Sequence, residues 1–342
     1  MVDMGVNISD IIVKEKASIS DFSGRWIAVD AYNILYQFIS IIRQPDGTPL
    51  MDSQGRVTSH LSGLLSRTTS LLGAGINLVF VYDGEPHELK SGTLRGRRAR
   101  KEKAKAEWEA ALEEGDLETA RTKAQQTSVL THDMVEDSKK LLGFFGIPWV
   151  AAPSDGEAQA SYMAGKGDVW GCASQDFDSL LFGADNLIRN LTISGRRKMP
   201  KRRAYITVEP EVVSLTETLS SLNITREQLI DVAILVGTDF NEGIKGIGPK
   251  KGLKLIQKLG NLEAVFEEKD ITVEDYQEVR DIFLSPRVTD GYVVKKIKMN
   301  VEGAVKLLVD EHDFSEERVK SSLGKIKEER ESEAQVSLDR WA

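Results

Sequence analysis

APSDGEAQASYMAGKGDVWGCASQDFD, residues 152–178, predicts a short helix followed by a buried strand. Glycines at 165 and 167 end the helix, and the apolar run 169–173 forms the strand. Asp155 and Glu157 open the helix, while Asp176 and Asp178 follow the strand. Because ligands bind outside the carboxyl ends of the strands in an open α/β sheet, these four carboxylates are a candidate metal site.

Two other apolar strands end in the same way. Residues 26–29 run into Asp30, and residues 78–82 run into Asp83. A single Asp after a strand is more often a turn or capping residue than a catalytic one, but three such strands favour a metal site. A local alternative stays open, since Ser154 and Glu157 fit a capping box and Asp155 suits the positive end of a helix dipole.

Composition is typical of a globular protein. The chain has 342 residues, 41% of them hydrophobic, and a net charge of −8. No apolar run reaches the roughly 18 residues of a membrane span, and the start shows no signal pattern, so we expect a cytoplasmic protein without membrane association. The single cysteine, Cys172, excludes an internal disulfide, and the four scattered histidines argue against a zinc site.

Basic residues are concentrated in three patches despite the acidic total. The patches span residues 90–105, 196–203 and 245–258. Basic patches beside an acidic pocket suggest a track for phosphate groups next to a metal site. Taken singly, each patch is equally well explained as a solvated face.

The alternation of strands and helices over residues 26–191 predicts α/β layering, with a sheet covered by helices on both faces. A long charged helical insertion, residues 88–131, follows Asp83 and splits into two arms at Gly115 and Asp116. It is either a solvated hairpin or a movable gate, and its position favours the gate. We divide the chain into an α/β core (1–222), a helical subdomain (223–328) and a flexible tail (329–342).

The helical subdomain contains a glycine-rich hairpin between two helices. An apolar run ends near Asp239, another acid, and Gly246, Gly248, Lys250, Lys251 and Lys254 follow within 15 residues. Free backbone N–H groups at a helix start, flanked by lysines, predict sequence-neutral phosphate binding. A nucleotide-binding P-loop is excluded, because it needs Gly-Lys followed by Ser or Thr.

The tail ends in a short hydrophobic pattern. Gln335 precedes Leu338 and Trp341, which lie three residues apart and share one side of a helical turn. We interpret this pattern as a segment that docks into a hydrophobic pocket on a partner protein.

Taken in order, the acidic blocks resemble the flap endonuclease family, archaeal branch, over essentially the whole chain. The resemblance rests on the motifs VDA (29–31), YDGEP (82–86), PSDGEA (153–158), SQDFD (174–178), GTD (237–239) and GIGPK (246–250). It implies a PIN-like mixed-sheet nuclease core, a helical arch and a C-terminal helix-hairpin-helix subdomain. It also implies two Mg²⁺ ions, with Mn²⁺ as a substitute, and cleavage of 5′ flap DNA at single-strand to duplex junctions. The expected setting is Okazaki fragment maturation and DNA repair.

Residue roles follow from the resemblance, position by position. Lys90 and Arg97 match arch residues that contact the scissile phosphate, and Tyr36 matches an aromatic that stacks on a substrate base. The tail resembles the family's box for the sliding clamp (PCNA). The family usually has Glu where this chain has Asp155, so we expect Asp155 to reach a metal through a water molecule. The implied metal ligands are Asp30, Asp83, Asp155, Glu157, Asp176, Asp178 and Asp239.

Phosphodiester chemistry agrees with these roles. Carboxylates that hold two Mg²⁺ ions about 4 Å apart would activate a water and stabilise the leaving oxygen, while Lys90 and Arg97 neutralise developing charge. Two alternatives remain: a DNA-binding scaffold without catalysis, and a related gap- or RNA-directed nuclease. The intact acids argue against the scaffold, because a pure binder has no use for carboxylates that repel one another.

Overall fold

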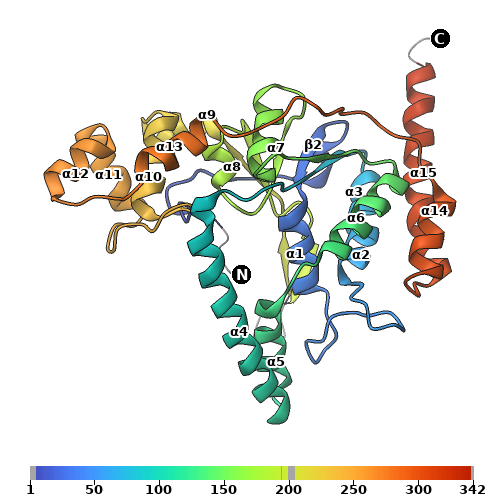
Figure 1. The fold of residues 1–342 in the computed structure, drawn as a ribbon. Helices are drawn as coiled ribbons and strands as arrows, with labels where there is room; N and C mark the ends of the chain where they lie inside the picture. The colour runs from blue at the N-terminus through green and yellow to red at the C-terminus, as the bar shows by residue number, and fades with distance from the viewer. Residues whose placement is uncertain (1–4, 194, 199–204, 340–342) are drawn as a thin grey trace.

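The computed structural model describes residues 5–193, 195–198 and 205–339, without the side chains of residues 91–99, 196–198, 205–206 and 328–339. An α/β body carries a projecting helical hairpin, α4 and α5 (Figure 1). Helices α10 to α13 extend to one side of the body, and α14 and α15 lie at the opposite side (Figure 1).

The centre of the body is a mixed sheet. Among the described residues it has seven strands in the order β1-β9-β6-β5-β2-β3-β4. Strands β4, β3, β2, β5 and β6 are parallel, and β9 and β1 are antiparallel to their neighbours. The chain passes from β2 to β3 on one side, whereas β5 pairs with the other side of β2, so a topological switch point lies between β2 and β5. The bounds are β1 Glu15–Lys16, β2 Trp26–Asp30, β3 Asn77–Tyr82, β4 Trp149–Ala151, β5 Gly171–Ala173, β6 Asn186–Arg189 and β9 Glu211–Ser214.

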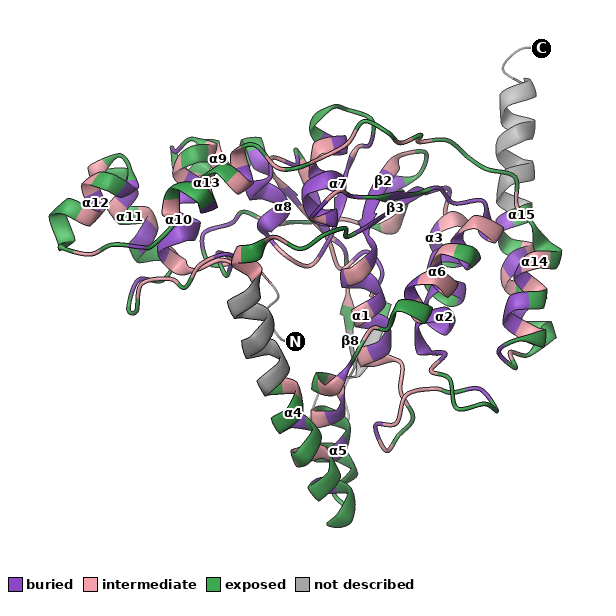
Figure 2. Ribbon diagram, viewed as in Figure 1, coloured by how far each residue is buried: buried purple, intermediate pink, exposed green. Residues whose placement is uncertain are grey.

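Helices bury both faces of the sheet, as predicted. In β3, Leu78 and Phe80 belong to the core under α1, α2, α3 and α6, while Val79 and Val81 belong to the core under α7. Successive strand residues point to opposite faces, which is why these doubly covered strands are continuous apolar runs (Figure 2). The helices are α1 Ala31–Ile41, α2 Ser59–Gly63, η2 Leu64–Thr68, α3 Thr69–Leu72, α6 His132–Phe145, α7 Gly156–Gly165, α8 Asp178–Leu181 and α9 Leu215–Leu222.

The predicted insertion, residues 88–131, forms a helical arch that leaves the body (Figure 1). Its arms meet where expected. Gly115 adopts φ 73°, which favours glycine, and Asp116 caps α5 by accepting from the Thr119 amide at 3.1 Å. Trp108 Nε1 donates to the Asp46 carbonyl at 3.2 Å, which ties the arch to the loop after α1. The arch consists of η3 Glu88–Lys90, α4 Ser91–Glu113, α5 Leu117–Ala124 and η4 Gln125–Thr127.

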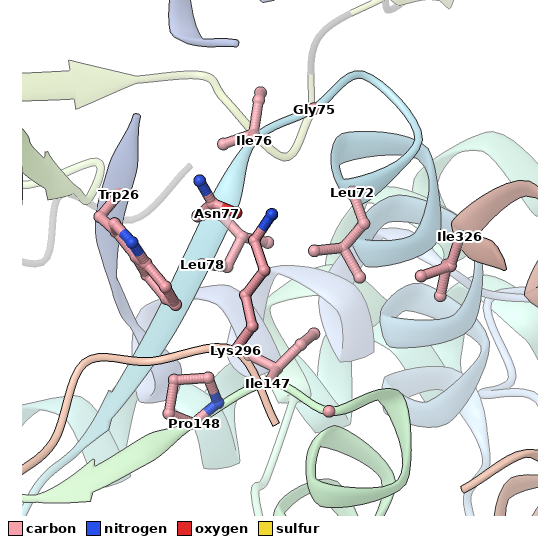
Figure 3. A pocket seen from close by; sticks show the side chains of 11 residues that line it. Trp26, Leu72, Gly75, Ile76, Asn77, Leu78, Ile147, Pro148, Lys296 and Ile326 are labelled. Carbon is pink, nitrogen blue, oxygen red and sulfur yellow. The ribbon is translucent and has the colours of Figure 1, made fainter. Parts of the chain in front are cut away.

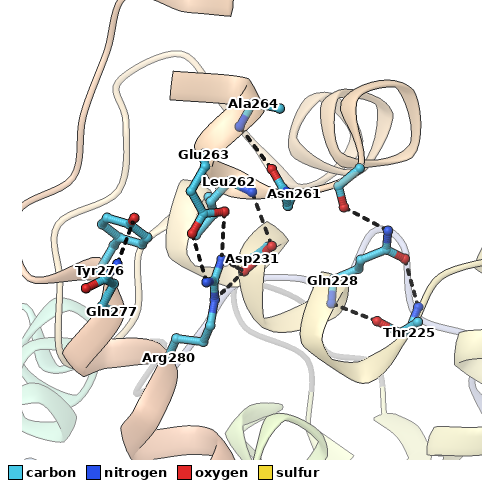
Figure 4. Close-up of polar contacts among 11 residues, drawn as sticks. Thr225, Gln228, Asp231, Asn261, Leu262, Glu263, Ala264, Tyr276, Gln277 and Arg280 are labelled. Carbon is cyan, nitrogen blue, oxygen red and sulfur yellow. Dashed lines mark hydrogen bonds and ion pairs between the residues drawn. The ribbon is translucent and has the colours of Figure 1, made fainter. Parts of the chain in front are cut away.

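One buried carboxylate links three helices of the helical subdomain. Asp231 on α10 accepts from Arg280 Nη2 of α13 at 2.7 Å and from the Leu262 amide of α12 at 3.3 Å (Figure 4). Arg280 also pairs with Glu263 of α12 at 3.0 Å. Helices α10 and α11 form the predicted helix-hairpin-helix. The bounds are α10 Arg226–Val236, α11 Pro249–Leu259, α12 Leu262–Lys269 and α13 Tyr276–Leu284.

The C-terminal part of the chain departs from the predicted boundaries. Residues 285–300 leave the helical subdomain and return along the body to α14 (Val301–Val305), η5 (Lys306–Asp310) and α15 (Glu316–Asp339) (Figure 1). Leu308 and Leu323 are buried in the same core as α1 and α6. The compact helical unit therefore ends near residue 284 rather than 328. Residues 329–339, expected as a flexible tail, continue α15.

A small cavity of about 20 Å³ lies at the amino ends of β2 and β3 (Figure 3). Trp26 and Asn77 begin these strands and line the cavity together with Ile326 of α15. It has room for about one water molecule. Because the predicted acids follow the carboxyl ends of the strands, this cavity lies at the wrong edge of the sheet to take part in their chemistry.

Two further observations concern regions outside the sheet. Strands β7 (Gly195–Lys198) and β8 (Tyr205–Val208) pair as an antiparallel hairpin, and the basic turn predicted between them falls outside the described residues. Among the helices that the structure describes, none combines the length and apolar character needed to cross a membrane.

Candidate active site

The four strand ends that carry the predicted acids are neighbours in the sheet. Parallel strands β4, β3, β2 and β5 end at the same edge, which brings together side chains up to 148 positions apart, from residue 30 to residue 178. These side chains line one cavity of about 1530 Å³, which is larger than a typical small-molecule pocket of roughly 300–1,000 Å³. The cavity lining includes Asp30, Asp83, Asp155, Glu157, Asp176, Asp178 and Asp239, together with Lys90 and Tyr36.

The start of α7 holds two of the acids. Asp155 is the N-cap, and its Oδ1 accepts from the amides of Glu157 at 3.0 Å and Ala158 at 3.3 Å. The Gly156 amide donates to Asp83 Oδ1 at 2.7 Å. A Cβ at position 156 would lie 2.7 Å from that same oxygen, so the contact requires glycine. The positive end of α7 thus binds two carboxylates, Asp83 after β3 and Asp155 after β4.

The capping-box alternative is wrong for Ser154 and Glu157. Ser154 Oγ donates to the Glu85 carbonyl at 2.9 Å instead of capping the helix. Glu157 is buried, and its Oε1 accepts from Ser179 Oγ at 2.5 Å. Capping is confirmed for Asp155, through one of its two oxygens.

Three donors that the sequence did not reveal hold other acids. The Val6 amide donates to Asp178 Oδ1 at 2.8 Å. Asn33 donates twice, from its amide to Asp30 Oδ1 at 3.0 Å and from Nδ2 to Asp176 Oδ2 at 2.9 Å. Asn33 stands three residues after an N-cap Asp, which signals the contact of its backbone amide with Asp30. Nothing in the sequence signals the contact of its side chain with Asp176. The contact between Val6 and Asp178 spans 172 residues, so no local pattern could indicate it.

Burial and mutual repulsion raise the pKa values of Asp30, Asp178 and Glu157. Burial, followed by the charge of Asp83, raises the pKa of Asp30 to about 8. Burial, followed by the charge of Asp239, raises the pKa of Asp178 to about 7. Burial, followed by the charge of Asp176, raises the pKa of Glu157 well above its usual value. A nearby cation favours the ionised form of such carboxylates, and a cluster of this kind in a cavity is typical of functional sites.

The donor set fits Mg²⁺ by its chemistry. The acids offer only carboxylate oxygens, which Mg²⁺ prefers to nitrogen or sulfur. Within the described part of the chain, no three His, Cys, Asp or Glu side chains are arranged to hold a metal ion as they stand. One oxygen each of Asp83 and Asp155 accepts from an α7 amide, and Asp176 Oδ2 accepts from Asn33, so these contacts fix how the three carboxylates are oriented.

Lys90 brings a positive charge into the acidic cavity. It ends η3 at the base of the arch and pairs with Asp155 Oδ2. Burial alone would lower the pKa of Lys90, but Asp155 and Asp83 outweigh it and raise that pKa, so the ammonium form persists. Arg97 lies in α4, and its side chain lies outside the description.

Tyr36 lies on α1 and faces the same cavity. Lys101 of the arch places its Nζ 4.9 Å from the centre of the Tyr36 ring. Arg100 and Lys103 of α4 also line the cavity, so the basic start of the arch faces the acids across the open space.

The glycine hairpin forms as predicted. Gly246 adopts φ 84°, and Gly248 is the N-cap of α11, with Pro249 in the first turn. Lys251 Nζ donates to the Gly246 carbonyl at 3.1 Å, while Lys250 and Lys254 are exposed on the first two turns of α11. The lysines are thus placed for contact with a phosphate backbone.

The predicted docking segment is only partly described. Gln335 and Leu338 lie in α15, and their side chains lie outside the description. Trp341 lies outside the described residues altogether.

Comparison with known proteins gives the family. The XPG N-terminal domain matches residues 4–104, and the XPG I-region matches residues 146–239. Flap endonuclease 1 of Methanococcoides burtonii is 50% identical over 99% of this chain and 100% of its own length. The chain belongs to the flap endonuclease family. The solved flap endonuclease-1 of Methanococcus jannaschii has this fold, with a TM-score of 0.76 and 42% identity over 96% of this chain and 100% of that one.

A more distant structure shares the fold alone. The Holliday junction-resolving enzyme GEN1, solved with product DNA and a Mg²⁺ ion, has a TM-score of 0.56 and 17% identity. The match covers 86% of this chain and 70% of the GEN1 chain. The α/β nuclease fold of the family therefore occurs in proteins that bind DNA and Mg²⁺.

Proposed function

We propose that this chain cleaves DNA at the base of 5′ flaps, where a single strand meets a duplex, and also acts as a 5′–3′ exonuclease. Its family makes it a nuclease, a hydrolase of phosphodiester bonds. The observation that carries the proposal is the cavity lined by the seven acids, Lys90 and the basic start of the arch. The setting that we propose is Okazaki fragment maturation and DNA repair in the cytoplasm.

The division of the chain suggests how a branched substrate is held. We assign the chemistry to the α/β core (1–222) with its arch (88–131), and duplex binding to the helical subdomain that begins at residue 223. The cavity volume of about 1530 Å³ suits a strand of nucleic acid better than a small molecule. Tyr36 offers a flat ring on which a base can stack, and Lys250, Lys251 and Lys254 offer charge to the duplex backbone.

The carboxylates are the proposed ligands of two Mg²⁺ ions, for which Mn²⁺ would substitute. Bound metal would supply an activated water and positive charge for the leaving oxygen. Asp155 uses Oδ1 for the α7 amides and Oδ2 for Lys90, which supports the prediction that it acts through a water rather than as a direct ligand. The full proposed set is Asp30, Asp83, Asp155, Glu157, Asp176, Asp178 and Asp239.

Lys90 and Arg97 are the proposed partners of the scissile phosphate. Lys90 already lies among the acids with its ammonium charge retained, so it can neutralise charge that develops on the phosphate oxygens. Burial of Asp30 and Asp178 excludes bulk water from their side, which strengthens the electrostatic interactions there.

The C-terminal segment is a proposed docking element for the sliding clamp (PCNA). This assignment rests on the spacing of Gln335, Leu338 and Trp341 in the sequence. Helix α15, which carries residues 335–339, lies at the side of the body opposite the helical subdomain (Figure 1).

A cleavage assay tests the main proposal. Labelled flap, nicked, hairpin and RNA-containing substrates are incubated with the full chain, with and without Mg²⁺, beside Asp178→Ala. We expect Mg²⁺-dependent cleavage, fastest on the flap, and a loss of several orders of magnitude in the variant with flap binding retained. Binding without cleavage by the unmodified chain would support the scaffold alternative, and preference for RNA or gaps would support the related nuclease.

A further inference from the structure

Asn33 lies where the two halves of the acidic site meet. It is in the first turn of α1, which leads directly from β2, and it is 5% exposed. The switch point separates β2, which delivers Asp30, from β5, which delivers Asp176. These two acids stand 146 positions apart in the sequence, so only side-chain and backbone contacts fix their relative position.

Asn33 contacts the acids on both sides of the switch point. Its backbone amide donates to Asp30 Oδ1 at 3.0 Å, and its Nδ2 donates to Asp176 Oδ2 at 2.9 Å. A carboxylate only accepts hydrogen bonds, so the side-chain amide must face Asp176 with its nitrogen. Its oxygen is then free to accept from the other side.

A buried relay fixes that orientation. Gln37 Nε2, one helical turn further along α1, donates to Asn33 Oδ1 at 3.4 Å. Thr192 Oγ1, which follows β6, donates to Gln37 Oε1 at 3.2 Å. Gln37 is 9% and Thr192 is 4% exposed. Each link pairs one donor with one acceptor. All hydrogen bonds of the relay therefore point the same way, from Thr192 toward Asp176.

We infer that Asn33 is a positioning residue that presets Asp30 and Asp176 for divalent cations across the switch point. An amide suits this task because it orients two repelling carboxylates without adding a charge that competes with the cation. Mg²⁺ tolerates little deviation from octahedral geometry at 2.0 to 2.1 Å, so preset ligands raise its affinity. Partners that orient metal ligands typically contribute 10- to 100-fold in metal affinity or activity. The inference rests on the proposed function.

Calorimetric titration of MgCl₂ into the full chain without DNA tests the inference. Asn33→Ala should raise the dissociation constant for Mg²⁺ about 10-fold, and Gln37→Leu should raise it less, in the same direction. The double variant should resemble Asn33→Ala alone, because the two side chains act through one relay. Asn77→Ala is the matched control. It removes a buried amide that donates to the Gly24 carbonyl at 3.1 Å, at the opposite edge of the sheet.

Cleavage assays separate positioning from general stability. In Asn33→Ala the Mg²⁺ concentration for half-maximal rate should rise about 10-fold, while the rate at saturating Mg²⁺ and the KM for flap DNA stay near wild type. Equal Mg²⁺ affinity in wild type and Asn33→Ala would overturn the inference and leave the proposed function standing. A wild-type chain without Mg²⁺ affinity would overturn both. If Asn33→Ala does not fold, Gln37→Leu decides, and an unchanged Mg²⁺ affinity there overturns the relay.

Discussion

The ammonium group of Lys90 pairs with Asp155 Oδ2 while the other oxygen of Asp155 caps α7. This contact joins the base of the arch to the helix that begins beside the acids. Lys90 Nζ also lies 5.0 Å from the ring centre of Phe240, next to Asp239 in the chain. One lysine thus links the arch, the start of α7 and the helical subdomain.

Loss of Lys90 should affect the chemical step. Lys90→Ala is expected to lower the single-turnover cleavage rate of a flap by about 10²-fold or more, the scale for losing a positioned electrostatic donor. Lys105→Ala is the control, since Lys105 lies on the same arch in an exposed pair with Glu109 at 3.9 Å. If both variants changed KM equally and left the rate at saturating substrate unchanged, Lys90 would only attract DNA as a surface charge and would have no role in the chemical step.

Asp155 and Glu157 should respond differently to loss of charge. Asn caps helices as well as Asp, so Asp155→Asn should keep the start of α7 intact and lose only its charge. We expect it to reduce cleavage less than Glu157→Gln, and we expect Asp155→Glu to retain wild-type activity. Thermal unfolding and cleavage at saturating Mg²⁺ are the two readouts. Lower unfolding temperatures with normal cleavage in both variants would remove these residues from the metal site.

Removal of Arg280 should destabilise the helical subdomain. Arg280→Ala leaves the buried Asp231 carboxylate without its charged partner, which typically costs about 3 to 5 kcal/mol. Burial raises the pKa of Asp231 even beside Arg280. Protonation of Asp231 removes the buried charge, so the loss of stability should shrink as the pH falls. Chemical denaturation at pH 5 and pH 8 measures this difference.

Glu263→Ala serves as the control for Arg280. Glu263 is about half exposed and shares the same guanidinium, so its loss should cost about 1 kcal/mol or less. A similar loss in both variants at both pH values would show that the pair with Asp231 does not dominate the network.

The hairpin lysines should contribute to binding without sequence preference. Lys250→Ala combined with Lys254→Ala should weaken binding to every duplex and flatten the slope of log affinity against log salt by about 1 to 2. Fluorescence anisotropy over a range of salt concentrations checks this. An unchanged slope would show that the lysines do not contact phosphates. Lys269→Ala, at the far end of α12, is the control.

The C-terminal segment should matter only for the partner. Deletion of residues 335–342 should leave cleavage of free flaps unchanged and abolish stimulation by the sliding clamp. Trp341→Ala should have the same effect if the aromatic side chain fills a pocket on the clamp. A pull-down with the clamp that is insensitive to Trp341→Ala would show that docking occurs elsewhere.

The sequence alone determined which acids stand at strand ends. Apolar runs that end in Asp30 and Asp83, and a helix that opens with Asp155, are local patterns, because burial on both faces makes a strand apolar throughout and a helix start selects an acidic N-cap. The arch and the glycine hairpin were predictable for the same reason. Their turns need Gly115 and Gly246 at positive φ, and these glycines are visible in the sequence.

Only the tertiary structure decided how these local units meet. The strand order that brings Asp30 beside Asp176, the relay from Thr192 through Gln37 to Asn33, and the Val6 amide on Asp178 all join residues more than 140 positions apart. The sequence also did not show that α15 packs on the α/β core, because its apolar stripe could face that core or the core of the helical subdomain. Periodicity shows that a face is buried, but the partner that covers it follows from the packing of the whole chain.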